Sequence, residues 1–275
     1  MSAQPLSMAF LRDPLTVNYE PTPLTPRELA DLDVDAHLAD VERKQAFVTP
    51  MFEHIAPRYD DFTRLFSFGM DARWKGELMR WFDSVASTRC QVLDVACGTG
   101  DLALAAAVAR PDGLVSGVDA ARGMIEVARR RIAPGDTGRV TFATGDLTRL
   151  ELADASVDVI LAGYALRNVP QYGEALAELR RVLRPGGHLF TLDFHRPSNA
   201  VWRELLLGYL QLSGGIVGWY WHRAPIIYSY IAHSIRHFVT PEEFHRVQQV
   251  AGFDIVRQQQ YLGGGITLTH AVGRP

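Results

Sequence analysis

The chain has 275 residues, with 28 Lys and Arg against 31 Asp and Glu and a net charge of −3. This balance gives no electrostatic reason to expect binding to nucleic acid. Its two cysteines exclude a disulfide framework and fit a reducing, cytoplasmic compartment. We predict no metal site, because no Cys and His residues have the spacing of metal ligands. The length and a hydrophobic content of 47% suit one large α/β domain with additions.

The first 45 residues are predicted to form an N-terminal extension that is partly helical, and residues 46–275 to form the main domain. The first 25 residues show no periodicity, and they lack the charged start and apolar core of a signal peptide. Residues Pro26 to Val48 are helix-prone and follow Thr25, a candidate N-cap.

An aromatic block that also carries Arg and Asp follows at residues 51–60, ahead of a helix predicted from Asp71 to Val85. A block of this composition can fold back as a lid over a ligand site. A pair of helices packed against a sheet is the alternative, and composition alone does not choose between them.

The stretch from Val92 to Asp101 is the most informative part of the chain. A short apolar run predicts a buried strand, a glycine turn follows, and a strong helix former comes next. The pattern Gly98-x-Gly100-x-x-Ala103, with an acidic residue about 20 positions downstream, matches the loose dinucleotide fingerprint. The same residues read equally as the Asp-x-x-x-Gly-x-Gly loop of S-adenosylmethionine (SAM) methyltransferases. Either reading predicts a nucleoside ligand on the loop and helix N-terminus.

Strands and helices alternate after this stretch. Strands are predicted near 90–95, 114–118, 139–143, 157–162 and 187–194, and helices near 100–109, 122–132 and 171–184. Such alternation favours a parallel sheet covered by helices on both faces, with ligands beyond the carboxyl ends of the strands. Asp94, Asp119, Asp146 and residues 164–168 should therefore surround one site. The segment 184–187 is expected to end a helix, turn and start a strand.

An aromatic-rich insertion is predicted at about 196–240, rich in Trp and Tyr interleaved with Leu and Ile. It could cover a hydrophobic substrate and touch a membrane surface, or it could be an ordinary helical core. Its uncharged run from Leu205 to Trp221 falls short of the roughly 20 residues that span a bilayer and contains several glycines. A helix at 241–251 and an antiparallel strand pair, at 253–258 and 266–272, should complete the domain.

Together these blocks resemble the UbiE/MenG family of SAM-dependent C-methyltransferases of ubiquinone and menaquinone biosynthesis, from about Val48 to Gly273. The blocks are Met51-Phe52-x-x-Ile55-Ala56-Pro57-Arg58-Tyr59-Asp60, Ser67-Phe68-Gly69, Val92-Leu93-Asp94-x-Ala96-Cys97-Gly98-Thr99-Gly100-Asp101, Leu166-Arg167-Asn168-Val169, Arg181-Val182-Leu183-Arg184-Pro185-Gly186-Gly187, Tyr228-x-Tyr230-Ile231-x-x-Ser234-Ile235 and Gly264-Gly265-Ile266. Three departures from the family pattern lie near the expected acceptor pocket. Thr63 stands for Asn, Tyr164-Ala165 for Phe-Gly, and Asp193-Phe194 for Glu-Phe.

The resemblance implies a Rossmann-like class I methyltransferase fold, with a seven-stranded, mostly parallel sheet, an antiparallel last strand and a helical lid insertion. It implies SAM as the methyl donor and a reduced, prenylated benzoquinol or naphthoquinol as the hydrophobic acceptor. The residues expected at the SAM site are Asp94, Ala96, Gly98, Thr99, Gly100, Asp119, Ala120, Met124, Asp146, Leu147, Gly163 and Tyr164. Of these, Gly163 stands where the family usually has Ser.

The expected chemistry needs a proton acceptor and a group that stabilises a phenolate, because carbon on a neutral ring is a poor nucleophile. Arg167 is the candidate for the second role, since it stays protonated and offers a fixed fork of donors. A bound water should take the proton, with Tyr59, Asp60 and Asn168 completing the network. His195 is a further candidate base, although a lone His at a strand end is more often structural.

Three alternatives remain open from the sequence. The same scaffold could methylate carbon or oxygen of another hydrophobic aromatic or terpenoid secondary metabolite. The glycine loop could serve a dinucleotide-dependent oxidoreductase. The chain could also be a non-catalytic scaffold in a membrane-associated biosynthetic complex. Contact with the inner face of a membrane and a homodimer are further expectations.

Overall fold

A computed structural model describes residues 41–222 and 225–275. The first 40 residues lie outside the described part, and with them Thr25 and most of the predicted helix from Pro26. The described chain begins with helix α3 (Val41–Ile55).

One seven-stranded sheet, in the order β3-β2-β1-β4-β5-β7-β6, forms the centre of the molecule. The strands are β1 (Gln91–Val95), β2 (Leu114–Asp119), β3 (Val140–Thr144), β4 (Val157–Gly163), β5 (Leu183–Phe194), β6 (Phe253–Tyr261) and β7 (Ile266–Gly273). The first five pair in parallel, and β7 runs antiparallel to both β5 and β6. This confirms the predicted mostly parallel sheet with an antiparallel last strand.

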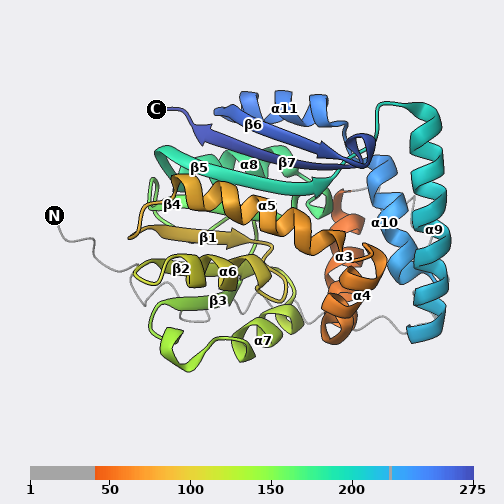
Figure 1. The fold of residues 1–275 in the computed structure, drawn as a ribbon, viewed down its shortest axis with the longest axis horizontal. Helices are drawn as coiled ribbons and strands as arrows, with labels where there is room; N and C mark the ends of the chain where they lie inside the picture. The colour runs from red at the N-terminus through yellow and green to blue at the C-terminus, as the bar shows by residue number, and fades with distance from the viewer. Residues whose placement is uncertain (1–40, 223–224) are drawn as a thin grey trace.

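Helices cover both faces of the sheet, as predicted (Figure 1). One face is packed by α5 (Met70–Val85), α6 (Asp101–Ala109) and α7 (Arg122–Arg130), and the other by α8 (Tyr172–Val182) and α11 (Pro241–Val250). Side chains of a strand alternate between the two resulting cores, so that Phe190 packs with the first set and its neighbour Leu189 with the second. Both faces are therefore buried, as a parallel sheet requires.

A separate group of helices stands at the end of the sheet where β1 finishes (Figure 1). It consists of α3, the short turn η2 (Ala56–Arg58), α4 (Tyr59–Phe66), α9 (Ala200–His222) and α10 (Ile226–His237). These helices share a third hydrophobic cluster, which includes Met51, Phe62, Leu206 and Tyr228. The cluster joins the block before the glycine loop to the predicted insertion, although these segments are far apart in the sequence.

Three element boundaries differ from the predictions. Helix α3 continues past Val48 and through Pro50 to Ile55, because Met51 and Ile55 are held in the third cluster. Helix α8 ends at Val182, two residues earlier than predicted, and β5 begins at Leu183. Residues 184–187 therefore belong to β5 and form a bulge in it where it pairs with β4. Strand β6 extends to Tyr261 rather than ending three residues earlier.

Candidate active site

The glycine loop follows β1 and leads into α6, as predicted. Gly100 has φ 87° and caps the helix, and a Cβ there would lie 2.8 Å from the ring of Phe142. Gly98, at φ 54°, has open space where a Cβ would be. The loop therefore needs Gly100 for packing, and at Gly98 it leaves backbone open for a ligand to approach closely.

Asp119 at the end of β2 holds this loop in place. Its Oδ2 accepts a hydrogen bond from the Gly98 N–H at 2.8 Å, and its Oδ1 accepts one from the Ala121 N–H at 2.8 Å. Burial raises the pKa of the carboxyl above its usual value, and these backbone donors oppose that shift. The carboxylate lies at the end of β2, beside the loop that follows β1. In this position its oxygens can accept hydrogen bonds from the two ribose hydroxyls of a nucleoside.

Asp94 lies beneath the loop rather than in the open. It is fully buried, and its Oδ2 accepts a hydrogen bond from the Ala103 N–H in α6 at 2.8 Å. Burial raises its pKa from 3.8 to about 8. Asp94 was predicted at the SAM site, and its burial there disfavours the ionised form of the carboxyl in the free protein.

The raised pKa of Asp94 predicts how SAM binding depends on pH. A cation near the carboxylate favours its ionised form, so SAM should bind more tightly as the pH rises toward about 8, with release of a proton. The free energy of unfolding of the free protein should change in the opposite sense, falling as the pH rises from 3.8 to about 8. Calorimetric titration with SAM at several pH values checks the first sign, and urea unfolding of the free protein at the same pH values checks the second. Asp94→Asn is the control that should flatten both dependences. Equal slopes in the two proteins would remove Asp94 from this role.

Two other candidates are tied to the loop. The Thr99 hydroxyl donates to Asp60 Oδ1 at 2.7 Å, and Arg131 donates to Asp60 Oδ2 at 3.2 Å. Asp60 thus connects α4 with the glycine loop, which differs from its predicted place in the proton network of the acceptor. Arg131 also donates to the Thr99 carbonyl at 2.8 Å, a link that sequence reasoning missed.

The remaining cofactor candidates lie along the same strand ends. The exposed Asp146 accepts from the backbone and hydroxyl of Thr148, both at 2.8 Å, and so stabilises its own turn. Leu147 and Met124 are buried in hydrophobic clusters, and Ala120 is exposed beside Asp119.

Ala96 begins the glycine loop with φ 48°, in the left-handed region. At Gly163 a Cβ would lie 2.7 Å from Leu102, so the Ser usual in the family would press on that flexible side chain here.

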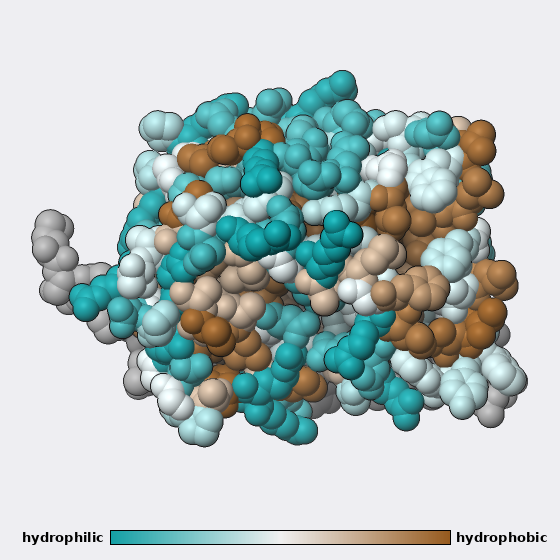
Figure 2. Space-filling view, viewed as in Figure 1, coloured by the Kyte–Doolittle hydropathy of each residue, from teal (hydrophilic) through white to brown (hydrophobic). Residues whose placement is uncertain are grey.

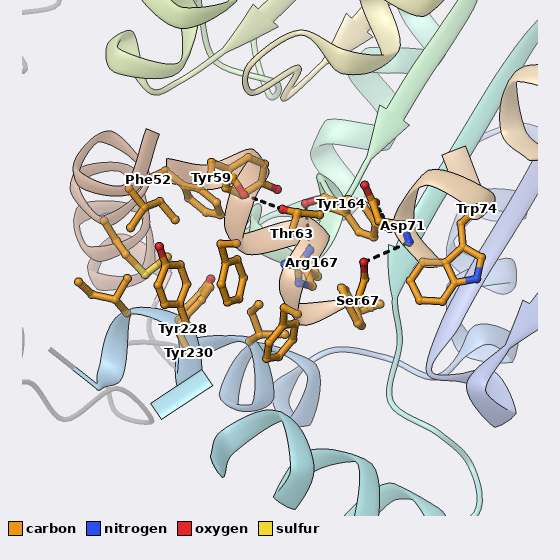
Figure 3. Close-up of a pocket in the computed structure, with 17 residues that line it drawn as sticks. Phe52, Tyr59, Thr63, Ser67, Asp71, Trp74, Tyr164, Arg167, Tyr228 and Tyr230 are labelled. Atoms are coloured by element: carbon orange, nitrogen blue, oxygen red, sulfur yellow. Dashed lines mark hydrogen bonds between the residues drawn. The ribbon is translucent and has the colours of Figure 1, made fainter. Parts of the chain in front are cut away.

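An aromatic cavity lies at the end of the sheet, where helices of the separate group meet the strand ends (Figure 3). Its lining comes from α3, α4, α5, α10, the end of β5 and the segment after β4, and comprises Met51, Phe52, Ile55, Tyr59, Phe62, Thr63, Phe66, Ser67, Asp71, Trp74, Tyr164, Arg167, Phe194, Ile227, Tyr228, Tyr230 and Ile231. The three positions that depart from the family pattern all contribute here. Thr63 and Tyr164 line the cavity, and Asp193 pairs with the cavity residue Arg167.

Arg167 lies at the centre of this cavity (Figure 3). It is buried, its Nη1 donates to Asp193 Oδ1 and to the Tyr164 carbonyl, both at 3.0 Å, and its guanidinium lies 5.1 Å from the Phe194 ring centre. Its Nε is buried and has no hydrogen-bond partner among the described residues. A buried guanidinium with a spare donor is costly unless a further acceptor arrives.

A second cation adds to the positive charge around Arg167. Lys44 Nζ donates to the Arg167 carbonyl at 2.8 Å, and burial together with the nearby guanidinium lowers the pKa of Lys44 to about 8. Asp193 is the carboxylate that faces this pair directly. Below about pH 8 the cavity residue Arg167 and the neighbouring Lys44, which is outside the lining, thus set two cations against the carboxylate of Asp193. This charge balance favours an anionic oxygen beside Arg167.

Two predicted catalytic residues lie close to Arg167. Tyr59 lines the cavity, and burial raises its pKa. Asn168 donates from Nδ2 to the Tyr164 carbonyl at 3.1 Å and accepts from the Tyr230 hydroxyl at 3.0 Å. Asn168 thus fixes Tyr230 of α10 against the segment after β4, and it contributes to the cavity through that partner.

Asp71 and Lys75 are site residues that sequence reasoning missed. The Tyr164 hydroxyl donates to Asp71 Oδ1 at 2.7 Å, and Lys75 Nζ lies 2.9 Å from both Asp71 Oδ2 and Asp101 at the glycine loop. Tyr164 thus belongs to the aromatic cavity, although it was predicted at the cofactor. The i,i+4 spacing of Asp71 and Lys75 was a readable signal, but it usually marks a surface ion pair.

His195 does not enter the cavity, so its predicted role as a base is wrong. It is fully buried between Phe238 and Phe244, with ring centres 5.2 and 5.0 Å away, in the core on the other face of the sheet. Burial lowers its pKa to about 4. The chain turns away after β5, where the His195 N–H bonds to the Gly265 carbonyl.

This sheet order, with a glycine loop after the first strand and a carboxylate at the end of the second, defines the class of Rossmann-like methyltransferases. A solved SAM-dependent methyltransferase from Aquifex aeolicus has the same fold, with a TM-score of 0.56 at 18% identity over 80% of this chain and 97% of that one. A family model described as the ubiE/COQ5 methyltransferase family matches residues 39–273, and the chain belongs to this family.

Curated relatives agree with the family. The chain is similar to "Ubiquinone/menaquinone biosynthesis C-methyltransferase UbiE" of Syntrophotalea carbinolica, at 36% identity over 80% of this chain and 91% of that protein. It is also similar to "Demethylmenaquinone methyltransferase" of Listeria welshimeri, at 33% identity over 83% of this chain and 96% of that protein. The chain is thus a methyltransferase whose methyl donor is SAM, which excludes the oxidoreductase alternative.

Proposed function

We propose that the chain transfers the methyl group of SAM to a ring carbon of a reduced, prenylated benzoquinol or naphthoquinol. The observation that carries this proposal is the Nε of Arg167, which has no hydrogen-bond partner in the described part of the chain and lies in a cavity of mostly aromatic and aliphatic side chains. Such a cavity suits a flat apolar ring, and the guanidinium suits the anionic oxygen that the ring must develop. The names of the two relatives support the same substrate class.

Bound SAM supplies an activated methyl group, so the protein has to align the acceptor and exclude water. The loop at Gly98 and the carboxylates of Asp119 and Asp94 would hold the nucleoside and the methionine end. Tyr59 and Tyr228 would hold the ring within the aromatic cavity. Loss of the hydroxyl proton would raise the electron density at the neighbouring ring carbon, and Arg167 would favour that loss by donating to the phenolate oxygen.

Asp71 is our candidate for the proton acceptor. Among the described lining residues of the aromatic cavity it is the only carboxylate. A ring hydroxyl can pass its proton to Asp71 through a water, or through the Tyr164 hydroxyl as that group gives its own proton to Asp71 at 2.7 Å. Lys75, 2.9 Å from the same carboxylate, would hold it in place.

The substrate class is tested by incubating purified protein and SAM with demethylmenaquinol, a demethylbenzoquinol and simple phenols. We expect methylated product from the quinols, as seen by mass spectrometry, and little from the phenols. Preferential methylation of the phenols would favour the alternative of a secondary-metabolite methyltransferase.

We also propose that α9 contacts a membrane surface. Figure 2 shows hydrophobic side chains gathered over this helix. Several exposed ones recur every three or four residues along it, as Leu205, Tyr209, Leu212, Ile216 and Trp219, and Tyr220 follows the last of them. Such a stripe suits a helix lying in the plane of the interface. Within residues 41–222 and 225–275, no helix meets the length and hydropathy needed to cross a bilayer.

Removing apolar side chains from this stripe should weaken binding to lipid. The double variant Leu212→Ser and Ile216→Ser is expected to reduce flotation with anionic lipid vesicles by about tenfold or more, since roughly 1.5–3 kcal/mol attaches to each side chain that is fully buried. Methylation of a short-chain quinol without vesicles should be unchanged. Flotation equal to that of the wild type would contradict the membrane contact. A shift from dimer to monomer in sedimentation would instead assign the stripe to the expected homodimer.

A further inference from the structure

A second cavity lies next to the aromatic cavity and opens toward α9. The two share four lining residues, Phe66, Ser67, Trp74 and Phe194, so they adjoin each other across these side chains. The second cavity has a volume of about 270 Å³, whereas the aromatic cavity has about 40 Å³ in this structure. A 150 Å³ cavity is known to hold a benzene ring, so the second space is already large enough for a hydrocarbon group, whereas the aromatic cavity has to widen before it takes the acceptor ring.

The lining of this second cavity is mostly apolar. No charged side chain lines it within the described chain. Two of its polar groups are engaged within the protein, since Ser67 Oγ accepts from the Asp71 N–H at 3.2 Å and Trp202 Nε1 donates to the Leu262 carbonyl at 2.6 Å. The hydroxyl of Tyr209 and the indole N–H of Trp74 are the other polar side-chain groups of the lining. Buried Leu206 and Leu210 complete the wall. A surface of this composition favours an apolar occupant.

We propose that this second cavity binds the hydrocarbon side chain carried by the acceptor ring, as a tail site distinct from the ring site. The inference rests on the proposed function, because the ring must lie beside Arg167. A substituent on that ring then has a direct apolar path past Phe66 and Phe194, which border both cavities. Because this space is already present in the protein, binding of the tail does not have to offset the free-energy cost of opening it.

The far end of the tail site reaches the surface beside α9. Phe68 and Leu205 line the cavity and are 75% and 63% exposed, so they form its rim. Leu205 also begins the exposed stripe of α9. A long chain can therefore lie with its ring end in the protein and its remainder along the apolar face of α9.

The two leucines Leu205 and Leu212 give a matched test. Both lie on α9 with similar exposure, 63% and 69%, but only Leu205 lines the tail site. We would measure binding of methylhydroquinone and decylhydroquinone by calorimetry, without vesicles, below the micelle concentration and with S-adenosylhomocysteine present. The proteins are the wild type, Leu205→Trp and Leu212→Trp, with Leu205→Lys as a second change at the rim.

In the wild type the decyl compound should bind about 100-fold more tightly than the methyl compound, a gain that a few buried methylenes supply. Both Leu205 variants should lose at least about tenfold of that gain, while Leu212→Trp keeps it. Equal affinity for the two ligands in the wild type, or equal losses at both leucines, would overturn the tail site. Methylation of methylhydroquinone by the wild type reports separately on the proposed function.

Discussion

Replacing Arg167 with lysine is expected to slow methylation of the quinol by about 100-fold or more, which is the usual cost of removing one donor to a developing oxyanion. Lysine keeps the positive charge beside Asp193 but lacks the planar fork and the Nε–H of arginine. The measurement is single-turnover methyl transfer with saturating SAM. Because Arg167 does not touch the glycine loop, the affinity for S-adenosylhomocysteine should stay within about threefold of the wild type.

The lysine variant is preferred to Arg167→Ala because the pair with Asp193 is buried. Removing one partner of a buried pair costs about 3–5 kcal/mol of stability, and unfolding would imitate a catalytic defect. The double variant Arg167→Met with Asp193→Leu removes both charges and serves as a folding control. Wild-type turnover in either variant would exclude Arg167 from the chemistry.

Replacing Asp119 with alanine is expected to weaken SAM binding by about 100-fold or more. The two ribose hydroxyls would lose the carboxylate that accepts their hydrogen bonds. Hydrogen bonds to a charged group contribute about 1.5–3 kcal/mol each. The change also frees the N–H groups of Gly98 and Ala121, which loosens the loop. Calorimetric titration with SAM gives the dissociation constant directly.

Asp146→Ala is the matched control for Asp119→Ala. Asp146 is exposed and one of its oxygens is already engaged by Thr148, so losing it should weaken SAM binding by about tenfold or less. A larger loss at Asp146 than at Asp119 would mean that the nucleoside lies differently across the strand ends.

The sequence predicts the sheet well because its signals are local. Each buried parallel strand is a short apolar run, and the glycine turn at residues 98–100 marks where β1 meets α6. The carboxylates at the strand ends follow from the same alternation. Residues 184–187 were harder, because a Pro-Gly-Gly turn and a bulged strand start share the same residues and only the pairing with β4 distinguishes them.

The acceptor side of the site depends on contacts that no local pattern records. Asp71 faces the cavity because Tyr164, far away in the sequence, donates to it across the sheet end. Tyr230 reaches Asn168 only because α10 packs against the segment after β4. His195 follows a strand that ends at the cavity, but the backbone turns there, and burial between two phenylalanines decides its role.

Transfer of a labelled methyl group tests the central claim most directly. Purified protein would be given demethylmenaquinol and SAM that carries ¹³C in its methyl group, and the product examined by carbon NMR. We predict one labelled methyl group bonded to a ring carbon, with all ring oxygens unmethylated. A label found on oxygen, or no label on the quinol while SAM is bound, would contradict the account.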